Sequence, residues 1–437
     1  MSEIEGPAPT TGSPPPQRPL RVAMYSGIVV ERDAVSRSLL HKLEVLRRLV
    51  ALGAPLEVTV FAQSLDDDQP EFRLCPTVAK LLGRDEFWAA DLHIFEEGMY
   101  YELFDSVFLI PPGRPILAIE HNSTPAELVD VPEARLAVER SHAQRPNLLL
   151  ADHVACVSEL NVEMARSVGV PEERISVLHL PPAVVPLEPP PPLRARSGPV
   201  RLLYLGRFVH AKGIDDMLAL VERLTAEGGD RFEVTLAGDP RFSDPRQLEA
   251  AAAAAAAAPG RVEVVFAPDD AQTATLFARA DALVIPSRHE GYCVPVVEAY
   301  GFGRMVIAYD AGNLPTIMGG LGLVAPTGDV GALEAAVRRF ADALQAPSEC
   351  GEPVVPTERG EMAASGWREA LGIHLRDYSA ANFERRFLAL FAGLASASPP
   401  GLSPGLERAI TARLDALGPE LVLPGGLAGH QVDRGGD

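Results

Sequence analysis

The stretch VRLLYLGRFVHAKG, residues 200–213, decides the fold because it joins an apolar strand pattern to a basic loop just ahead of a helical pattern. A strand that enters a helix through a glycine-containing turn is the repeating unit of a doubly wound parallel sheet. Arg207 and Lys212 lie in the loop, Gly206 precedes them, and the N-terminus of the next helix attracts anions. The stretch therefore predicts a diphosphate site, although a solvated loop with two surface charges would show the same spacing.

A second motif, PSRHEGYCVPVVEA at residues 286–299, also follows a strand pattern. Its loop holds Glu290, and Pro295 stands where the first helical turn should begin. Glu290 could accept hydrogen bonds from sugar hydroxyls and Glu298 from a ribose, but a charged helix face would also carry two such glutamates. The amides at the helix start could bind a phosphate or sugar oxygen, and they belong to Gly291, Tyr292, Cys293 and Val294.

Strand and helix patterns alternate on both sides of these motifs. Strands are predicted near residues 22–25, 56–62, 92–95, 116–120, 153–157, 202–205, 232–237, 262–266, 282–286 and 305–309. Helices are predicted between them, including the alanine-rich residues 250–258. This α/β pattern predicts two Rossmann-like, doubly wound domains that face each other across a cleft.

Pro-rich segments set the predicted domain boundaries. We predict a disordered tail at 1–19, an N-terminal domain at 20–183, a Pro-rich linker at 184–199, a C-terminal domain at 200–373, a helix at about 374–395, and a mostly disordered tail at 396–437. Residues 347–368 show no clear period and are predicted to form a loop.

Composition excludes several functional classes. A formal net charge of −20 would repel nucleic-acid phosphates and anionic lipids, so we expect no nucleic acid partner and no stable membrane association. No signal-peptide pattern or long apolar run occurs, which predicts a cytoplasmic protein and leaves a homo-oligomer open. The 4 cysteines lie far apart, so no metal site is predicted. Lysine occurs only at Lys42, Lys80 and Lys212.

Together the two motifs, G-R-x-x-x-x-K-G and E-x7-E, resemble those of the retaining GT-B glycosyltransferases of glycosyltransferase family 4. The resemblance covers most of residues 21–394. It includes residues 151–159, 301–303, 305–309, 311–315 and 319–322. It implies that the N-terminal domain receives the acceptor, that the C-terminal domain binds the donor nucleotide sugar, and that the C-terminal helix crosses back to the N-terminal domain.

The resemblance also implies a role for each motif residue. Arg207 and Lys212 would bind the donor diphosphate and neutralise the leaving group, whereas Glu290 would hold the donor sugar and Glu298 the ribose. His121, in the segment IEHNS, falls at a strand end where the family often places a histidine near the reacting sugar. A histidine packed at a strand terminus explains it equally well on sequence grounds.

The chemistry implied is hexosyl transfer with retention through an oxocarbenium-like transition state, by front-face attack. No metal and no cofactor are expected beyond the donor itself, for which a GDP- or UDP-linked sugar is favoured. The run Asp66-Asp67-Asp68 matches a metal motif of another glycosyltransferase fold, but its turn-forming neighbours indicate a solvated loop tip.

Two departures from the family pattern concern the acceptor side. Many relatives carry a Gly-Gly turn after the first strand for the acceptor and sugar-phosphate region, where this chain has the single Gly27 in SGIV. We still expect Gly27 among the donor-binding residues. Thr316 stands where relatives often have an acidic residue. Both leave the acceptor undefined and do not affect the predicted fold.

Other functional classes share this architecture. An oxidoreductase would carry its glycine fingerprint after the first strand, yet residues 301–303 follow a helix and enter a strand. A hydrolysing sugar-nucleotide epimerase and a non-catalytic nucleotide-sugar-binding subunit remain alternatives. For the transferase, the charge of −20 favours a small soluble acceptor, as in bacterial specialised-metabolite, antibiotic or thiol biosynthesis.

Overall fold

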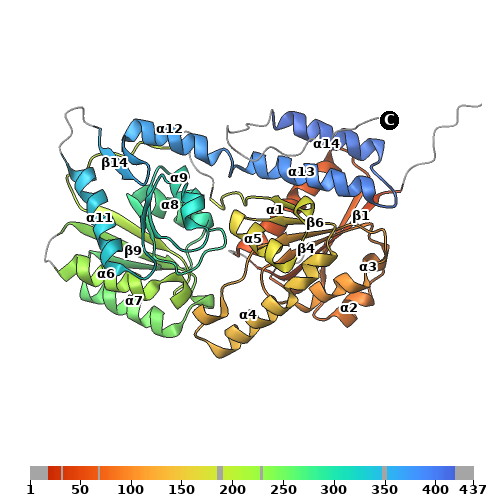
Figure 1. Cartoon of the computed structure of the whole chain (residues 1–437), viewed down its shortest axis with the longest axis horizontal. Helices are drawn as coiled ribbons and strands as arrows, with labels where there is room; N and C mark the ends of the chain where they lie inside the picture. Colours follow the sequence, from red (N-terminus) through yellow and green to blue (C-terminus); the bar gives the residue numbers. More distant parts are fainter. Residues whose placement is uncertain are drawn as a thin grey trace, which may run out of the picture.

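The computed structural model describes residues 18–30, 33–66, 69–184, 190–226, 230–346 and 352–418, without the side chain of Phe242. Two α/β domains lie side by side, and the last helices of the chain lie on the N-terminal one (Figure 1). The two predicted Rossmann-like, doubly wound domains are thus confirmed. No helix in the described part of the chain is both long and apolar enough to cross a membrane.

The N-terminal domain is built on a seven-stranded parallel sheet of order β3-β2-β1-β4-β5-β6-β7. Its strand order reverses between β1 and β4, and such switch points are where doubly wound sheets bind ligands. The strands are β1 (Leu20–Val29), β2 (Leu56–Leu65), β3 (Phe72–Leu74), β4 (Leu92–Glu97), β5 (Ile116–Glu120), β6 (His153–Cys156) and β7 (Ile175–Val177). The short edge strands β3 and β7 were not predicted from the sequence.

Helices and 3-10 turns cover both faces of this sheet. They are α1 (Ala34–Ala51), α2 (Val78–Leu82), α3 (Asp85–Ala89), η1 (Glu102–Leu109), η2 (Ala126–Leu128), α4 (Pro132–Gln144), η3 (Arg145–Leu150), α5 (Glu159–Val168) and η4 (Glu172–Arg174). Alternation along β4 sends Ile94 into the core that α1 also lines and Phe95 into the opposite core. The next two residues, Glu96 and Glu97, therefore leave the strand on opposite faces.

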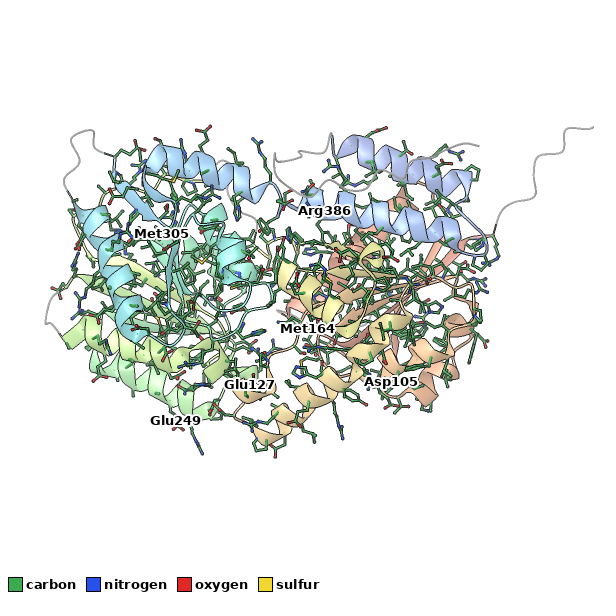
Figure 2. All side chains as sticks on the ribbon, viewed as in Figure 1. Asp105, Glu127, Met164, Glu249, Met305 and Arg386 are labelled. Atoms are coloured by element: carbon green, nitrogen blue, oxygen red, sulfur yellow. The ribbon has the colours of Figure 1, made fainter. Side chains whose placement is uncertain are left out.

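The C-terminal domain is built on a six-stranded parallel sheet of order β10-β9-β8-β11-β12-β13, which switches between β8 and β11. Its strands are β8 (Val200–Leu205), β9 (Phe232–Gly238), β10 (Val262–Phe266), β11 (Ala282–Ile285), β12 (Met305–Tyr309) and β13 (Leu323–Ala325). Its helices are η5 (His210–Lys212), α6 (Ile214–Ala226), η6 (Pro240–Phe242), α7 (Pro245–Ala257), α8 (Asp270–Arg279), α9 (Val294–Gly301), α10 (Leu314–Met318) and α11 (Val330–Gln345). Figure 2 shows Met305 inside this domain and Glu249 on the outer helix α7.

The loop predicted at residues 347–368 is wrong for its described part. An antiparallel hairpin of β14 (Val354–Thr357) and β15 (Gly360–Ala363) leads into α12 (Ala364–Leu375). Gly360 has a φ of 106°, which its lack of a side chain permits. Trp367 anchors α12 because its ring is fully buried and its indole N–H donates to Leu321 O at 2.8 Å.

The predicted end of the chain also needs correction. The helix placed at about 374–395 begins only at α13 (Ala380–Ala397), where Ser379 caps it by accepting from the Asn382 amide. Within the tail predicted as mostly disordered, α14 (Pro404–Ala416) packs against α1 and α13. Leu406, Ala409 and Ile410 provide its buried face.

The second half of the predicted linker lies against the C-terminal domain. Leu193 is buried, and the Arg196 amide donates to Leu344 O at 2.9 Å. The Arg196 guanidinium also pairs with Asp281 at 2.6 Å. Predictions that fall outside the described residues concern the tail at 1–17, Asp67, Asp68, the linker residues 185–189, Cys350 and the tail at 419–437.

Candidate functional site

The basic loop lies at the carboxyl end of β8, beside the switch point of its sheet. Gly213 follows η5 with a φ of 64°, and a Cβ there would lie 1.8 Å from the carbonyl oxygen of Pro286. Only glycine lets the basic loop approach the end of β11 so closely. This contact brings the two sequence motifs, at residues 206–213 and 286–299, side by side.

Lys212 and Glu290 form the central ion pair of the site. The Lys212 ammonium donates to both carboxylate oxygens of Glu290 at 2.8 Å, and Ser287 Oγ donates to Oε1 at 2.7 Å. The Glu290 backbone is fixed in turn, because the Asn313 amide donates to its carbonyl at 2.9 Å. Arg207 is exposed, and its guanidinium has no ion-pair partner in the described part of the chain. One cation of the predicted pair is therefore neutralised and the other is free.

The helix start that follows Glu290 has an unusual backbone. Cys293, the N-cap of α9, has a φ of 77°, and Gly291 lies so close to Asn122 that a Cβ would meet its side chain at 2.6 Å. Tyr292 is buried and donates its hydroxyl to Leu180 O at 2.6 Å. The first turn, with Val294 as its first residue, thus lies against the N-terminal domain.

Glu298 is buried beneath this turn. Its Oε1 accepts hydrogen bonds from the amides of Ala183 at 2.9 Å and Val184 at 3.1 Å. Burial raises the pKa of Glu298 to about 7, although the two amides oppose the shift. Glu298 was predicted to bind the ribose. In this structure one of its carboxylate oxygens therefore binds the segment that joins the domains.

The N-terminal domain contributes His121, which directly follows β5. Its Nε2 lies 2.7 Å from Glu96 Oε2, and Glu96 forms an ion pair with Lys42 at 3.0 Å. Lys42 and Glu96 are both fully buried. The sequence drew attention to Lys42 only by the scarcity of lysine, and gave no indication of Glu96.

A pair of neighbouring carboxyls lies on the other face of the sheet. Register makes Glu97 and Glu120 direct neighbours on β4 and β5, and both are buried. Burial and the adjacent Glu97 raise the pKa of Glu120 well above its ordinary value, which favours the protonated form of the Glu120 carboxyl. Sequence reasoning missed this pair, because nothing in a strand pattern reveals which residues become cross-strand neighbours.

Several contacts join the two domains. Asn122, with a φ of 66°, places its Nδ2 2.7 Å from His289 Nε2. Ser158 Oγ donates to Gly291 O at 2.6 Å, and Arg37 pairs with Asp270 at 2.7 Å. Figure 2 shows Glu127, just ahead of α4, at this junction. The domains are thus closed over the second motif.

Gly27 does not lie in a turn after the first strand, as the sequence suggested. It is part of β1, which continues to Val29, and a Cβ there would lie 2.9 Å from Tyr101 Cβ. The strand is longer than predicted because Ile28 and Val29 still pair with β2. Thr316 lies in α10 and is exposed.

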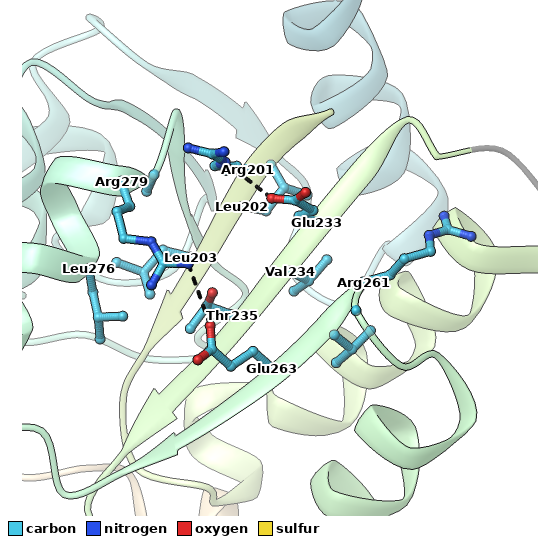
Figure 3. Close-up of a pocket in the computed structure, with 13 residues that line it drawn as sticks. Arg201, Leu202, Leu203, Glu233, Val234, Thr235, Arg261, Glu263, Leu276 and Arg279 are labelled. Carbon is cyan, nitrogen blue, oxygen red and sulfur yellow. Dashed lines mark hydrogen bonds and ion pairs between the residues drawn. The ribbon is translucent and has the colours of Figure 1, made fainter. Parts of the chain in front are cut away.

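A hollow of about 530 Å³ lies elsewhere, at the amino ends of β8, β9 and β10 (Figure 3). Two ion pairs line it, Arg201 with Glu233 at 3.1 Å and Arg279 with Glu263 at 3.9 Å. None of the motif residues contributes to it. We therefore place the candidate site at the carboxyl ends of the strands, where the charged and strained residues gather.

Comparison with known proteins shows which proteins this chain is similar to. Residues 199–343 match the family model of glycosyl transferases group 1. A glycogen synthase of Mycobacterium tuberculosis is 33% identical over 153 residues, which cover 34% of this chain and 36% of that protein. A 2-deoxystreptamine glucosyltransferase of Streptomyces kanamyceticus is 35% identical over 153 residues, 34% of this chain and 38% of that protein. The match thus spans little more than a third of either relative's length.

Structural similarity extends over both domains. The structure of Anabaena HepE in complex with UDP superimposes on 86% of this chain and 100% of its own, with a TM-score of 0.60 at 14% sequence identity. At this level of identity the match establishes the two-domain GT-B fold.

Proposed function

We propose that this chain, which belongs to the group 1 glycosyl transferases, transfers a hexosyl group from a nucleotide diphosphate sugar to a small acceptor, with retention and without a metal. The observation that carries the proposal is the pairing of Lys212 with Glu290 beside the free Arg207. An exposed guanidinium next to an ammonium already held by a carboxylate suits a ligand that is both anionic and hydroxylated.

The donor diphosphate would bind at the basic loop. Arg207 offers a fork of donors to phosphate oxygens, and Lys212 neutralises the charge that develops on the departing nucleotide. Glu290 can then accept from hydroxyls of the donor sugar while Ser287 still donates to it. We assign UDP or GDP as the nucleotide class, and the UDP complex of HepE supports UDP as the first to test.

For transfer with retention, the acceptor would attack from the face that the diphosphate leaves. His121 stands on the opposite domain, one residue before Asn122, which contacts the second motif. It could therefore bind the reacting sugar while the oxocarbenium-like charge forms. Alanine at Lys212 or Glu290 should lower the rate of this reaction by roughly 10²- to 10³-fold.

The acceptor is the least defined partner. A net charge of −20 favours a neutral or cationic small molecule over an anionic lipid surface. The match to a 2-deoxystreptamine glucosyltransferase supports an acceptor from specialised, antibiotic-type metabolism of bacteria. We extend to this chain only the class, a small polar alcohol, amine or thiol.

The first experiment is a thermal shift assay against UDP, GDP, ADP and dTDP. A nucleotide that binds only the native state raises the melting temperature by mass action, and Arg207→Ala should remove most of that shift. Incubation of the matching nucleotide sugar without acceptor then separates the reaction classes. Epimerised sugar would identify a hydrolysing epimerase, and no shift with any of the four nucleotides would contradict the proposal.

A further inference from the structure

A buried lysine of the N-terminal domain has no part in the donor chemistry proposed above. Lys42 is one of three lysines in the chain, and its side chain is fully buried on α1. It pairs with Glu96 at 3.0 Å and also donates to Ser38 Oγ. Burying two charges is costly even when they are paired, so such a pair calls for a purpose other than stability.

Glu96 connects this pair to His121. Its Oε2 accepts from Ser38 Oγ at 3.2 Å and lies 2.7 Å from Nε2 of His121. Although burial alone would raise it, the Lys42 charge and the His121 hydrogen bond lower the pKa of Glu96. The carboxyl is therefore ionised and can only accept, so the shared hydrogen lies on Nε2 of His121.

The side chain of His121 also lies against Gly98. Gly98 leaves space for it, since a Cβ at that position would lie 3.0 Å from the Cβ of His121. With Nε2 held by Glu96, a neutral ring has only Nδ1 left, and that nitrogen carries a lone pair. It can accept from a hydroxyl, but it cannot bind a phosphate oxygen, which has no hydrogen to donate.

We propose that Glu96, with Lys42 as its buried counter-charge, is a positioning residue that holds His121 in the Nε2–H form, so that Nδ1 accepts a hydrogen bond from a sugar hydroxyl. The role of the hydroxyl rests on the proposed transfer reaction, whereas the control of the tautomer does not. His121 would then bind a hydroxyl of the sugar, whereas Arg207 and Lys212 would bind the diphosphate.

The tautomer is measured by nitrogen-15 NMR of the full chain with labelled histidine, and His121→Gln assigns the His121 signals. We expect a protonated Nε2 and an unprotonated Nδ1 in the wild type, and a mixture of tautomers in Glu96→Gln. Lys42→Met/Glu96→Gln removes both charges together, so it avoids an unpaired buried ammonium and should show the same mixture. An unchanged Nε2–H form in both variants would overturn the proposal.

Kinetics test the same idea through a double-mutant cycle. Glu96→Gln should lower kcat by roughly tenfold or more in the wild type, because loss of an orienting partner typically costs this much. In a His121→Ala background, Glu96→Gln should cause no further loss of kcat. Equal losses in both backgrounds would mean that Glu96 acts without His121, which would also overturn the proposal.

A matched control separates positioning from simple loss of a buried carboxylate. Glu384 is also buried and pairs with Arg48 at 3.0 Å and with Arg413. Glu384→Gln should leave the His121 tautomer and kcat unchanged. If the wild type transfers no sugar at all, the proposed function fails, but the NMR result still decides whether Glu96 controls His121.

Discussion

Replacing Glu298 by glutamine should flatten the pH dependence of stability and make the protein more stable above pH 7. Glu298 is 3% exposed, and its Oε1 accepts from the amides of Ala183 and Val184. Burial raises the pKa of Glu298 to about 7 in the folded protein, from an ordinary value of 4.5. Glutamine keeps an oxygen for the two amides and carries no charge to bury.

The magnitude follows from the size of this shift. A folded pKa of about 7 against 4.5 in the unfolded chain corresponds to about 3 kcal/mol, at roughly 1.4 kcal/mol per unit. Because the folded pKa is the higher one, the stabilising contribution is complete below pH 4.5 and is lost as the pH rises to about 7. Between pH 5 and pH 8 the variant should therefore gain roughly 2 to 3 kcal/mol relative to the wild type.

Trp367 provides the assay. Its ring lies 6.5 Å from Tyr300 of α9, the helix that carries Glu298, and Trp88→Phe leaves it as the sole tryptophan. Urea unfolding followed by Trp367 fluorescence at pH 5, 6, 7 and 8 gives both free energies of unfolding. Parallel pH profiles for the wild type and the variant would refute the reasoning. If Glu298 also binds the ribose, the more stable variant should show a weaker thermal shift with nucleotide.

Three further predictions concern the same region. Lys212→Met should lower the transfer rate by roughly 10²- to 10³-fold in a steady-state assay, whereas Met at the exposed Lys80 should not change it. Gly213→Ala should lower the free energy of unfolding, measured in urea, by at least about 2 kcal/mol, because the φ of Gly213 is positive and Pro286 occupies the space of a Cβ. Gly198→Ala should be close to neutral, because no atom lies within 4 Å of a Cβ at that position. His179→Gln should destabilise the protein more at pH 6 than at pH 9 in thermal melts. Although burial lowers the pKa of His179, Asp377 and Glu159 raise it more. The contribution of the charged His179 to stability is therefore lost as the pH rises through that pKa. An equal loss at both pH values would contradict this last expectation.

Sequence patterns predicted the two sheets well because buried parallel strands are continuous apolar runs with helices between them. The predicted strand at residues 305–309 is β12 (Met305–Tyr309), and the alanine-rich segment lies in α7. Short edge strands such as β7 (Ile175–Val177) were missed, since three residues carry too little pattern. The hairpin before α12 was missed because each of its strands, at residues 354–357 and 360–363, is too short to show a clear pattern.

The candidate site could be predicted only in part from the sequence. Lys212 and Glu290 stand in local motifs, so their proximity followed from strand topology. Glu96 and Asn122 act through partners that are distant in the chain, such as Lys42 and His289. Such contacts depend on register and on domain closure, which no local pattern encodes.

The return of α13 to the N-terminal domain has a consequence for how the molecule could be recombined. The chain leaves that domain after Leu180 and re-enters it near Tyr378, and His179 stacks on Tyr378 with ring centroids 4.6 Å apart. The C-terminal domain is therefore an insertion whose entry and exit meet at one place. Under the proposed function, a cassette cut at these two positions could be exchanged between relatives as a unit, so that the nucleotide sugar consumed changes while the surface that receives the second substrate stays intact.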